Sequence, residues 1–223
     1  DGADMQRYRK YLHAQVSELL TNYGPVGIMW FDGEWESTWR GSYGKELYEL
    51  CVGLQPEVIV NNRLGARGGM EGLTGMDGYA GGYGGDYMTP EQEIPDAVEQ
   101  GIDWETCMTM NGRWGYNMVD KNFKSTTDLL QKLSDIVSKS GNFLLNVGPK
   151  ADGTFPEESI QRLEEIGDWM DVNGEAIHGT VGSPFQELDW GRATQKFHDE
   201  STTLYLHVFD PICFLQMIVI HVF

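Results

Sequence analysis

The apolar positions in the first part of the chain predict helices alternating with short buried strands. From Tyr8 to Tyr23 they recur every three or four residues, and Gly24 and Pro25 then end the helix. The run 26–31 that follows is entirely apolar or glycine, which is typical of a strand buried on both faces. Residues 44–56 and 57–63 repeat this order and predict a second helix and a second strand.

The same alternation continues further along the chain. Residues 104–111 predict a strand, 125–141 a helix capped by Ser125, and 142–148 another buried strand. A final helix begins at Pro156. Strands that alternate with helices and are buried on both faces predict the α/β class with parallel pairing.

Two architectures fit this pattern: half of an eight-fold barrel, or a small doubly wound sheet. No GxGxxG or GxxxxGK[ST] motif follows any of the strands, which weighs against nucleotide binding. Polar residues cluster near the expected strand ends, namely Asp32, Arg63, Glu105 and Asn146. Barrel enzymes place their catalytic residues at the carboxyl ends of strands, so the barrel is favoured.

Two segments depart from the alternation. Residues 65–85 hold ten glycines in 21 positions and predict a long loop. Towards the end, "TTLYLHVFD" alternates like the first strand of a new β-domain, whereas 211–223 is an atypical, nearly all-apolar tail. The sequence pattern offers no structural account of that tail.

Composition narrows the classes of partner. The net charge is −18 and the 16 basic residues are scattered, which argues against binding nucleic acid or an anionic membrane surface. The three cysteines stand in no arrangement that suits zinc, so we expect free or buried thiols and no structural zinc site. The N-terminal residues resemble an amphipathic helix rather than a signal peptide, and they do not indicate a compartment.

Two carboxylates are the main candidates for chemistry. Asp32 ends the first buried strand, and Glu91 follows the glycine-rich loop. Facing each other across a pocket, one could attack a sugar carbon while the other donates a proton to the leaving oxygen. Each has a plainer interpretation: Asp32 as a loop carboxylate that caps backbone amides, and Glu91 as an acid in the first turn of a helix.

Glu105 is an alternative acid/base candidate, because it belongs to a predicted strand. Its plainer interpretation is a buried partner for an arginine such as Arg113.

Five blocks, taken together and in order, resemble the α-L-fucosidases of glycoside hydrolase family 29. They are "GIMWFDGEWE", "VIVNNRLG", "GDYMTPEQEIP", "WETCMTMNGRWGYN" and "GNFLLNVGPKADGTFPEESIQRLEEIGDWMDVNGEAIHGT". The blocks "TPEQE" and "WETCMTMN" look more like the branch of the family with broad linkage tolerance.

The resemblance implies a role for each residue of the site. Asp32 corresponds to the nucleophile and Glu91 to the acid/base. Trp30 resembles the aromatic residue beside the nucleophile, and Arg63 the arginine that binds sugar hydroxyls. Trp114 stands where the family places an aromatic ring against the C6 methyl of fucose. An arginine near Asp32 would favour its ionised form, whereas Glu91 would need drier surroundings to stay protonated.

The resemblance also implies a fold. Residues 1–182 would be the second half of a (β/α)8 TIM-type barrel, and 183–223 the start of a truncated C-terminal β-sandwich. The half-barrel would lack the part that supplies most contacts to the sugar hydroxyls. It would also expose two sheet edges and the inner layers of the core, so we expect a homo-oligomer or a completing chain.

The implied function is a retaining exo-glycosidase that removes terminal α-L-fucose from fucosylated oligosaccharides or glycoconjugates without a cofactor. One alternative is a non-catalytic fragment or a carbohydrate-binding remnant of such an enzyme. Another is a different exo-glycosidase that uses the same two carboxylates. Members of the family are often secreted, periplasmic or lysosomal.

Overall fold

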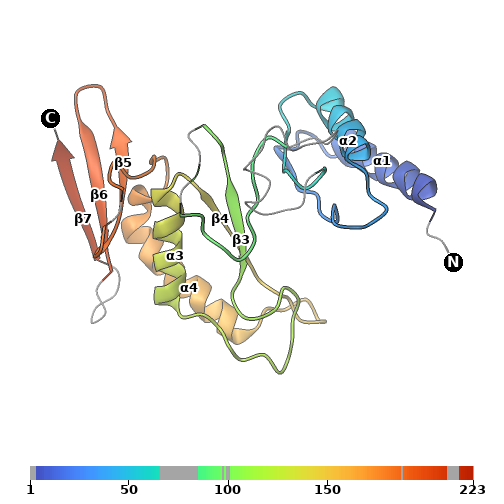
Figure 1. Ribbon diagram of the computed structural model, residues 1–223. Coiled ribbons are helices and arrows are strands. Elements are labelled where there is room, and N and C mark those ends of the chain that lie inside the picture. Colours follow the sequence, from blue (N-terminus) through green and yellow to red (C-terminus); the bar gives the residue numbers. More distant parts are fainter. Residues whose placement is uncertain are drawn as a thin grey trace. The chain divides into compact units, whose positions relative to one another are not determined.

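The computed structural model divides the chain into two compact units (Figure 1). The first comprises Asp1–Glu91 and Gln100–Trp104, and the second Gln92–Glu99 and Glu105–Phe223. The residues that the structure describes are 4–65, 85–96, 98, 101–186, 188–209 and 216–222. The predicted glycine-rich loop therefore lies almost entirely outside the described residues, as does Cys213.

The first unit packs two helices against a pair of parallel strands. Its elements are α1 (Met5–Asn22), β1 (Ile28–Met29), α2 (Gly41–Leu54) and β2 (Ile59–Val60). Asp4 caps α1 by accepting a hydrogen bond from the Arg7 amide. Side chains from all four elements meet in one apolar core that includes Val16, Leu20, Leu47, Cys51 and Val60.

The strands of the first unit are shorter and more exposed than their sequence predicts. Ile28 pairs with Ile59 in register, and these two side chains remain 51% and 42% exposed. Val60, one residue further along β2, is fully buried against the helices. Period-2 alternation thus places one face of this sheet in the core, and the prediction of strands buried on both faces is wrong for the described part of this unit.

The second unit repeats the strand–helix–strand order. β3 (Glu105–Thr109) and β4 (Asn142–Asn146) pair in parallel, and α3 (Thr126–Ser138) connects them. Ser125 accepts a hydrogen bond from the Asp128 amide, which confirms the predicted cap. α4 (Glu157–Asn173) and the short 3-10 helix η2 (Gly174–Ala176) follow. The predicted α/β class is confirmed.

The chain ends in an antiparallel sheet of three strands, β5 (Gly191–Phe197), β6 (Thr202–Val208) and β7 (Gln216–Val222), in the order β5–β6–β7. The sequence pattern predicts only the middle strand and leaves the apolar tail without a structure. In fact β7 lies within that tail and pairs with β6 along its whole length. The alternation that marks a strand is absent from this nearly all-apolar segment, so the pattern could not reveal the pairing.

Candidate active site

Three segments of the first unit bring polar side chains to one edge of its sheet. β1 and β2 run parallel, and Asn61 forms a further parallel bridge with Tyr87. Asp32, Arg63 and Glu91 each follow one of these segments within a few residues. Because the carboxyl ends of parallel strands meet at the same edge, residues that are distant in sequence are brought together there.

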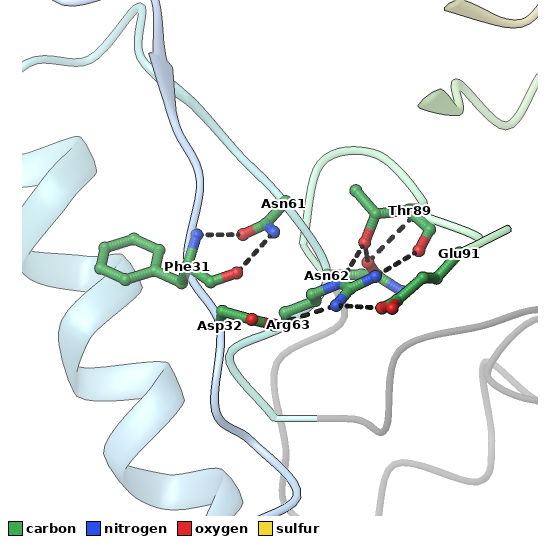
Figure 2. Close-up of polar contacts among 7 residues, drawn as sticks. All are labelled: Phe31, Asp32, Asn61, Asn62, Arg63, Thr89 and Glu91. Atoms are coloured by element: carbon green, nitrogen blue, oxygen red, sulfur yellow. Dashed lines mark hydrogen bonds and ion pairs between the residues drawn. The ribbon is translucent and has the colours of Figure 1, made fainter. Parts of the chain in front are cut away.

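Arg63 joins the two carboxylates. Its Nη1 donates to Asp32 Oδ1 at 2.9 Å and to Glu91 Oε2 at 3.0 Å (Figure 2). The two acceptor oxygens are therefore at most 5.9 Å apart, which is the sum of these distances. The arginine is only 3% exposed, so its charge is desolvated, whereas the side chains of Asp32 and Glu91 are 47% and 41% exposed.

Thr89 and Trp30 hold the rest of the guanidinium group. Arg63 Nε donates to Thr89 Oγ1 at 2.9 Å, and Nη2 donates to the Thr89 carbonyl at 3.1 Å. The ring of Trp30 packs against the group, with its centroid 4.8 Å from Arg63 Cζ. These contacts engage the planar fork of the arginine at Nε and Nη2 and fix its orientation.

Two buried amides that sequence reasoning missed, Asn61 and Asn62, complete the network (Figure 2). Asn61 bonds to both main-chain polar groups of Phe31, the residue before Asp32. Asn62 accepts from both the amide and the hydroxyl group of Thr89. The sequence signal was a pair of amides directly after an apolar strand, where buried polar groups need designated partners.

A hollow of about 150 Å³ opens beside Asp32 and Arg63. Apolar and aromatic side chains of α1 and of the chain after β1 line it, including Tyr8, Phe31 and Trp39. It is smaller than the roughly 300–1,000 Å³ of typical ligand pockets. Glu91 is not among its lining residues and is paired with Arg63, so the dry surroundings expected for Glu91 are not seen among the described residues.

The remaining predicted residues belong to the second unit. Trp114 is 40% exposed, and its carbonyl accepts a hydrogen bond from Asn146 Nδ2 at 2.7 Å. Glu105 is the first residue of β3 and pairs in register with Asn142, so it lies at the amino end of its strand. Catalytic groups of barrel enzymes lie at the opposite end, and this position disfavours Glu105 as the acid/base.

The part of the chain that the structure describes contains neither a metal-ligand cluster nor a membrane-spanning helix. No group of three or more His, Cys, Asp or Glu side chains there could hold a metal ion. No helix in the same residues is both long and apolar enough to cross a membrane.

Known proteins with similar sequences are α-L-fucosidases. The α-L-fucosidase family model matches residues 1–175. The α-L-fucosidase of Dictyostelium discoideum is 31% identical over 175 residues, which is 76% of this chain and 35% of that protein. The tissue α-L-fucosidase of Mus musculus is 31% identical over 173 residues, covering 74% of this chain and 35% of its own length.

Solved structures agree with the sequence comparison. α-L-fucosidase isoenzyme 1 from Paenibacillus thiaminolyticus has a TM-score of 0.81 and 37% identity, over 95% of this chain and 49% of that one. A family 29 α-L-fucosidase from Bacteroides thetaiotaomicron, trapped as a covalent intermediate with 2-fluoro-fucosyl fluoride, has a TM-score of 0.76 and 28% identity. That match covers 91% of this chain and 48% of the solved chain.

The chain thus spans about a third of the length of these curated relatives and about half of these solved structures. The family model nevertheless covers most of its residues. This chain belongs to the α-L-fucosidase family.

Proposed function

We propose that this chain carries the catalytic pair of a retaining α-L-fucosidase, with Asp32 as nucleophile and Glu91 as acid/base. The supporting observation is the arginine bridge, which keeps the two nearest carboxylate oxygens within 5.9 Å. Carboxyl groups of retaining glycosidases lie about 5–5.5 Å apart, whereas inverting enzymes need about 6.5–9.5 Å to admit a water molecule. The separation favours double displacement.

The proposed reaction has two steps. Asp32 Oδ attacks the anomeric carbon of a terminal α-L-fucoside, while Glu91 gives its proton to the departing glycosidic oxygen. In the second step Glu91, now ionised, takes a proton from water as the water displaces Asp32 from the sugar. Arg63 stabilises the ionised form of each carboxylate when it occurs.

Trp30 and Trp114 supply aromatic surface in this proposal. A 6-deoxy sugar presents a methyl group, and its pocket needs apolar faces beside the groups that bind hydroxyls. Trp30 already packs on Arg63. Trp114 would contact the methyl group of the fucose. The substrates would be fucosylated oligosaccharides or glycoconjugates, with broad linkage tolerance.

For the fold, we propose the second half of a (β/α)8 barrel at 1–182 and the start of a β-sandwich at 183–223. Two parallel strand pairs, each with a connecting helix, support the first part. The half-exposed pair Ile28 and Ile59 is what an incomplete barrel would leave uncovered. A second copy or a completing chain would bury this pair.

The roles of the two carboxylates can be tested separately with an aryl α-L-fucoside as substrate and azide as an added nucleophile. Asp32→Ala should abolish hydrolysis, and added azide should then yield the inverted β-fucosyl azide by direct displacement. Glu91→Ala should still form the glycosyl-enzyme from substrates with a good leaving group, and azide should yield the retained α-fucosyl azide. Hydrolysis that survives Asp32→Ala would contradict the assignment.

The second candidate is a non-catalytic carbohydrate-binding remnant. The small hollow and the exposure of both carboxylates favour it, because transition-state stabilisation needs prepositioned and desolvated contacts. Calorimetry with L-fucose separates the two functions: binding without turnover of any aryl glycoside in a panel supports the remnant. Turnover of a different glycoside would instead indicate another exo-glycosidase.

A further inference from the structure

We infer that two adjacent buried amides, Asn61 and Asn62, are positioning residues, the first for Asp32 and the second for Arg63. Neither touches a carboxylate in the described contacts, and each acts through one intermediate residue. The inference rests on the proposed function of Asp32 and Arg63, and it adds the residues that hold them in place.

Asn61 continues the strand pairing with its side chain. The β1–β2 ladder ends at the pair Met29 and Val60. One position further on, Asn61 Oδ1 accepts from the Phe31 amide and Nδ2 donates to the Phe31 carbonyl, both at 2.8 Å. The side chain is fully buried, so water does not compete for these bonds. Both polar groups of Phe31 are thus fixed, and Asp32 follows directly from that fixed main chain.

Asn62 orients the residue that holds Arg63. Its Oδ1 accepts from the Thr89 amide at 3.1 Å and from the Thr89 hydroxyl at 2.7 Å. Because the hydroxyl proton is directed to Asn62, the lone pairs of Thr89 Oγ1 remain available to Arg63 Nε at 2.9 Å. With Nε and Nη2 both held by Thr89, Nη1 is left to face Asp32 and Glu91.

Aspartate substitutions distinguish a positioning role of these amides from a purely structural one. Asn61 uses both ends of its amide on Phe31, so aspartate at this position would set a carboxylate oxygen against the Phe31 carbonyl. Asn62 uses only its oxygen on Thr89, while its nitrogen lies 3.5 Å from the sulfur of Met88. Aspartate can therefore replace both contacts of Asn62 to Thr89. At position 61 it can still accept from the Phe31 amide but cannot donate to the Phe31 carbonyl.

Gln55 provides a matched control. Its amide accepts from the Val26 amide and donates to the carbonyls of Leu20 and Gly24. It thus bonds to the chain leading into β1, whereas Asn61 bonds to the chain leaving it. Gln55→Ala should cost stability by the same kind of lost hydrogen bonds without disturbing Asp32.

The experiment measures labelling of Asp32 in the full chain by 2-fluoro-fucosyl fluoride, read by mass spectrometry. The new bond joins an Asp32 oxygen to the anomeric carbon, and fluoride leaves with the electron pair of the broken C–F bond. We expect Asn61→Ala and Asn61→Asp each to lower the maximal labelling rate about 100-fold, the effect of a misplacement of about 1 Å. The reagent concentration for half-maximal rate should change little.

Asn62→Ala should lower the rate on the order of 10- to 100-fold, and Asn62→Asp should restore most of that loss. Each variant is compared below its own melting temperature. A loss in Gln55→Ala as large as in Asn61→Ala, or equal losses in Asn62→Asp and Asn62→Ala, would overturn the inference.

Amide hydrogen exchange separates this inference from the proposed function. If the unsubstituted chain is not labelled at Asp32, the proposed function fails, and exchange alone then decides the positioning. Protection of the Phe31 amide should disappear in Asn61→Ala, which removes its acceptor, and that of the Thr89 amide in Asn62→Ala but not in Asn62→Asp. Unchanged protection in folded variants would overturn the positioning by itself.

Discussion

Gly44 lies directly against the carbonyl group of Leu64. A Cβ atom on Gly44 would stand 2.0 Å from the Leu64 oxygen, much closer than atoms can approach. The same carbonyl accepts a hydrogen bond from Trp39 Nε1. Because Leu64 follows Arg63, the close approach of helix α2 fixes the chain immediately behind the arginine that bridges the two carboxylates.

Gly44→Ala should therefore destabilise the protein, although alanine is normally the better helix residue. The clash involves main-chain atoms that cannot rotate away, and overpacking of this kind costs about 1–3 kcal/mol. At Gly53, in the same helix, a Cβ atom would meet no described heavy atom within 4 Å, and Gly53→Ala should stabilise by about 0.5–1 kcal/mol. Urea unfolding of both variants measures the difference, and equal changes would contradict the role of the contact.

Replacement of Arg63 by lysine should slow the chemical step even though the positive charge is kept. Arg63→Lys keeps a positive charge but loses the fork that engages Thr89, so the cation is no longer held between Asp32 and Glu91. We expect the rate of Asp32 labelling to fall about 100- to 1,000-fold, as when one fixed donor is removed from a transition-state site.

Arg9→Lys is the control for this substitution. Arg9 also stacks on an aromatic ring, that of Tyr43, and pairs with Glu46 in the same unit. Its replacement should leave the labelling rate unchanged. A lysine at position 63 that labels as fast as the unsubstituted chain would show that the fork is unnecessary.

The cap of helix α3 offers a test in the second unit. Ser125 Oγ accepts from the Asp128 amide at 3.1 Å. Ser125→Ala removes this acceptor and should lower the free energy of unfolding by about 1 kcal/mol, whereas Ser125→Asp should retain most of it. Chemical denaturation monitored by helical circular dichroism measures both, and an aspartate variant as unstable as the alanine variant would argue against the cap.

His207 should make the C-terminal sheet sensitive to acid. Burial lowers the pKa of His207 from 6.5 to about 4. Its Nε2 lies 3.1 Å from Thr194 Oγ1, whose proton goes to the Ala176 carbonyl, and Nδ1 has no hydrogen-bond partner among the described residues. A second proton would have to be accommodated at that buried nitrogen.

The direction of this pH dependence follows from the numbers of protons that the folded and unfolded chains bind. Between pH 6.5 and 4 the unfolded chain binds a proton at position 207 and the folded chain does not, so stability falls as pH falls through this window. The loss reaches about 3 kcal/mol and levels off below it. The difference between the unsubstituted chain and His207→Gln, followed by denaturation across this range, isolates the effect. Parallel pH curves for the two proteins would contradict it.

The local sequence pattern was sufficient to predict the helices and the class of the fold. The apolar spacing of α1 and α3, with Ser125 as a cap, depends on interactions within a few residues, which a single sequence contains. The strands were predicted less well. β1 and β2 are short because Asn61 continues the pairing with its side chain, and β7 lacks the alternation by which strands are recognised.

The sequence by itself determined which residue types are available for chemistry: two carboxylates, an arginine and aromatic residues, within blocks that resemble one family. It contained no measure of the distance between Asp32 and Glu91, which lie 59 positions apart. Only the tertiary structure brought them to one guanidinium group. It did so because parallel strands end at a common edge, and because the buried amides of Asn61 and Asn62 must find partners there.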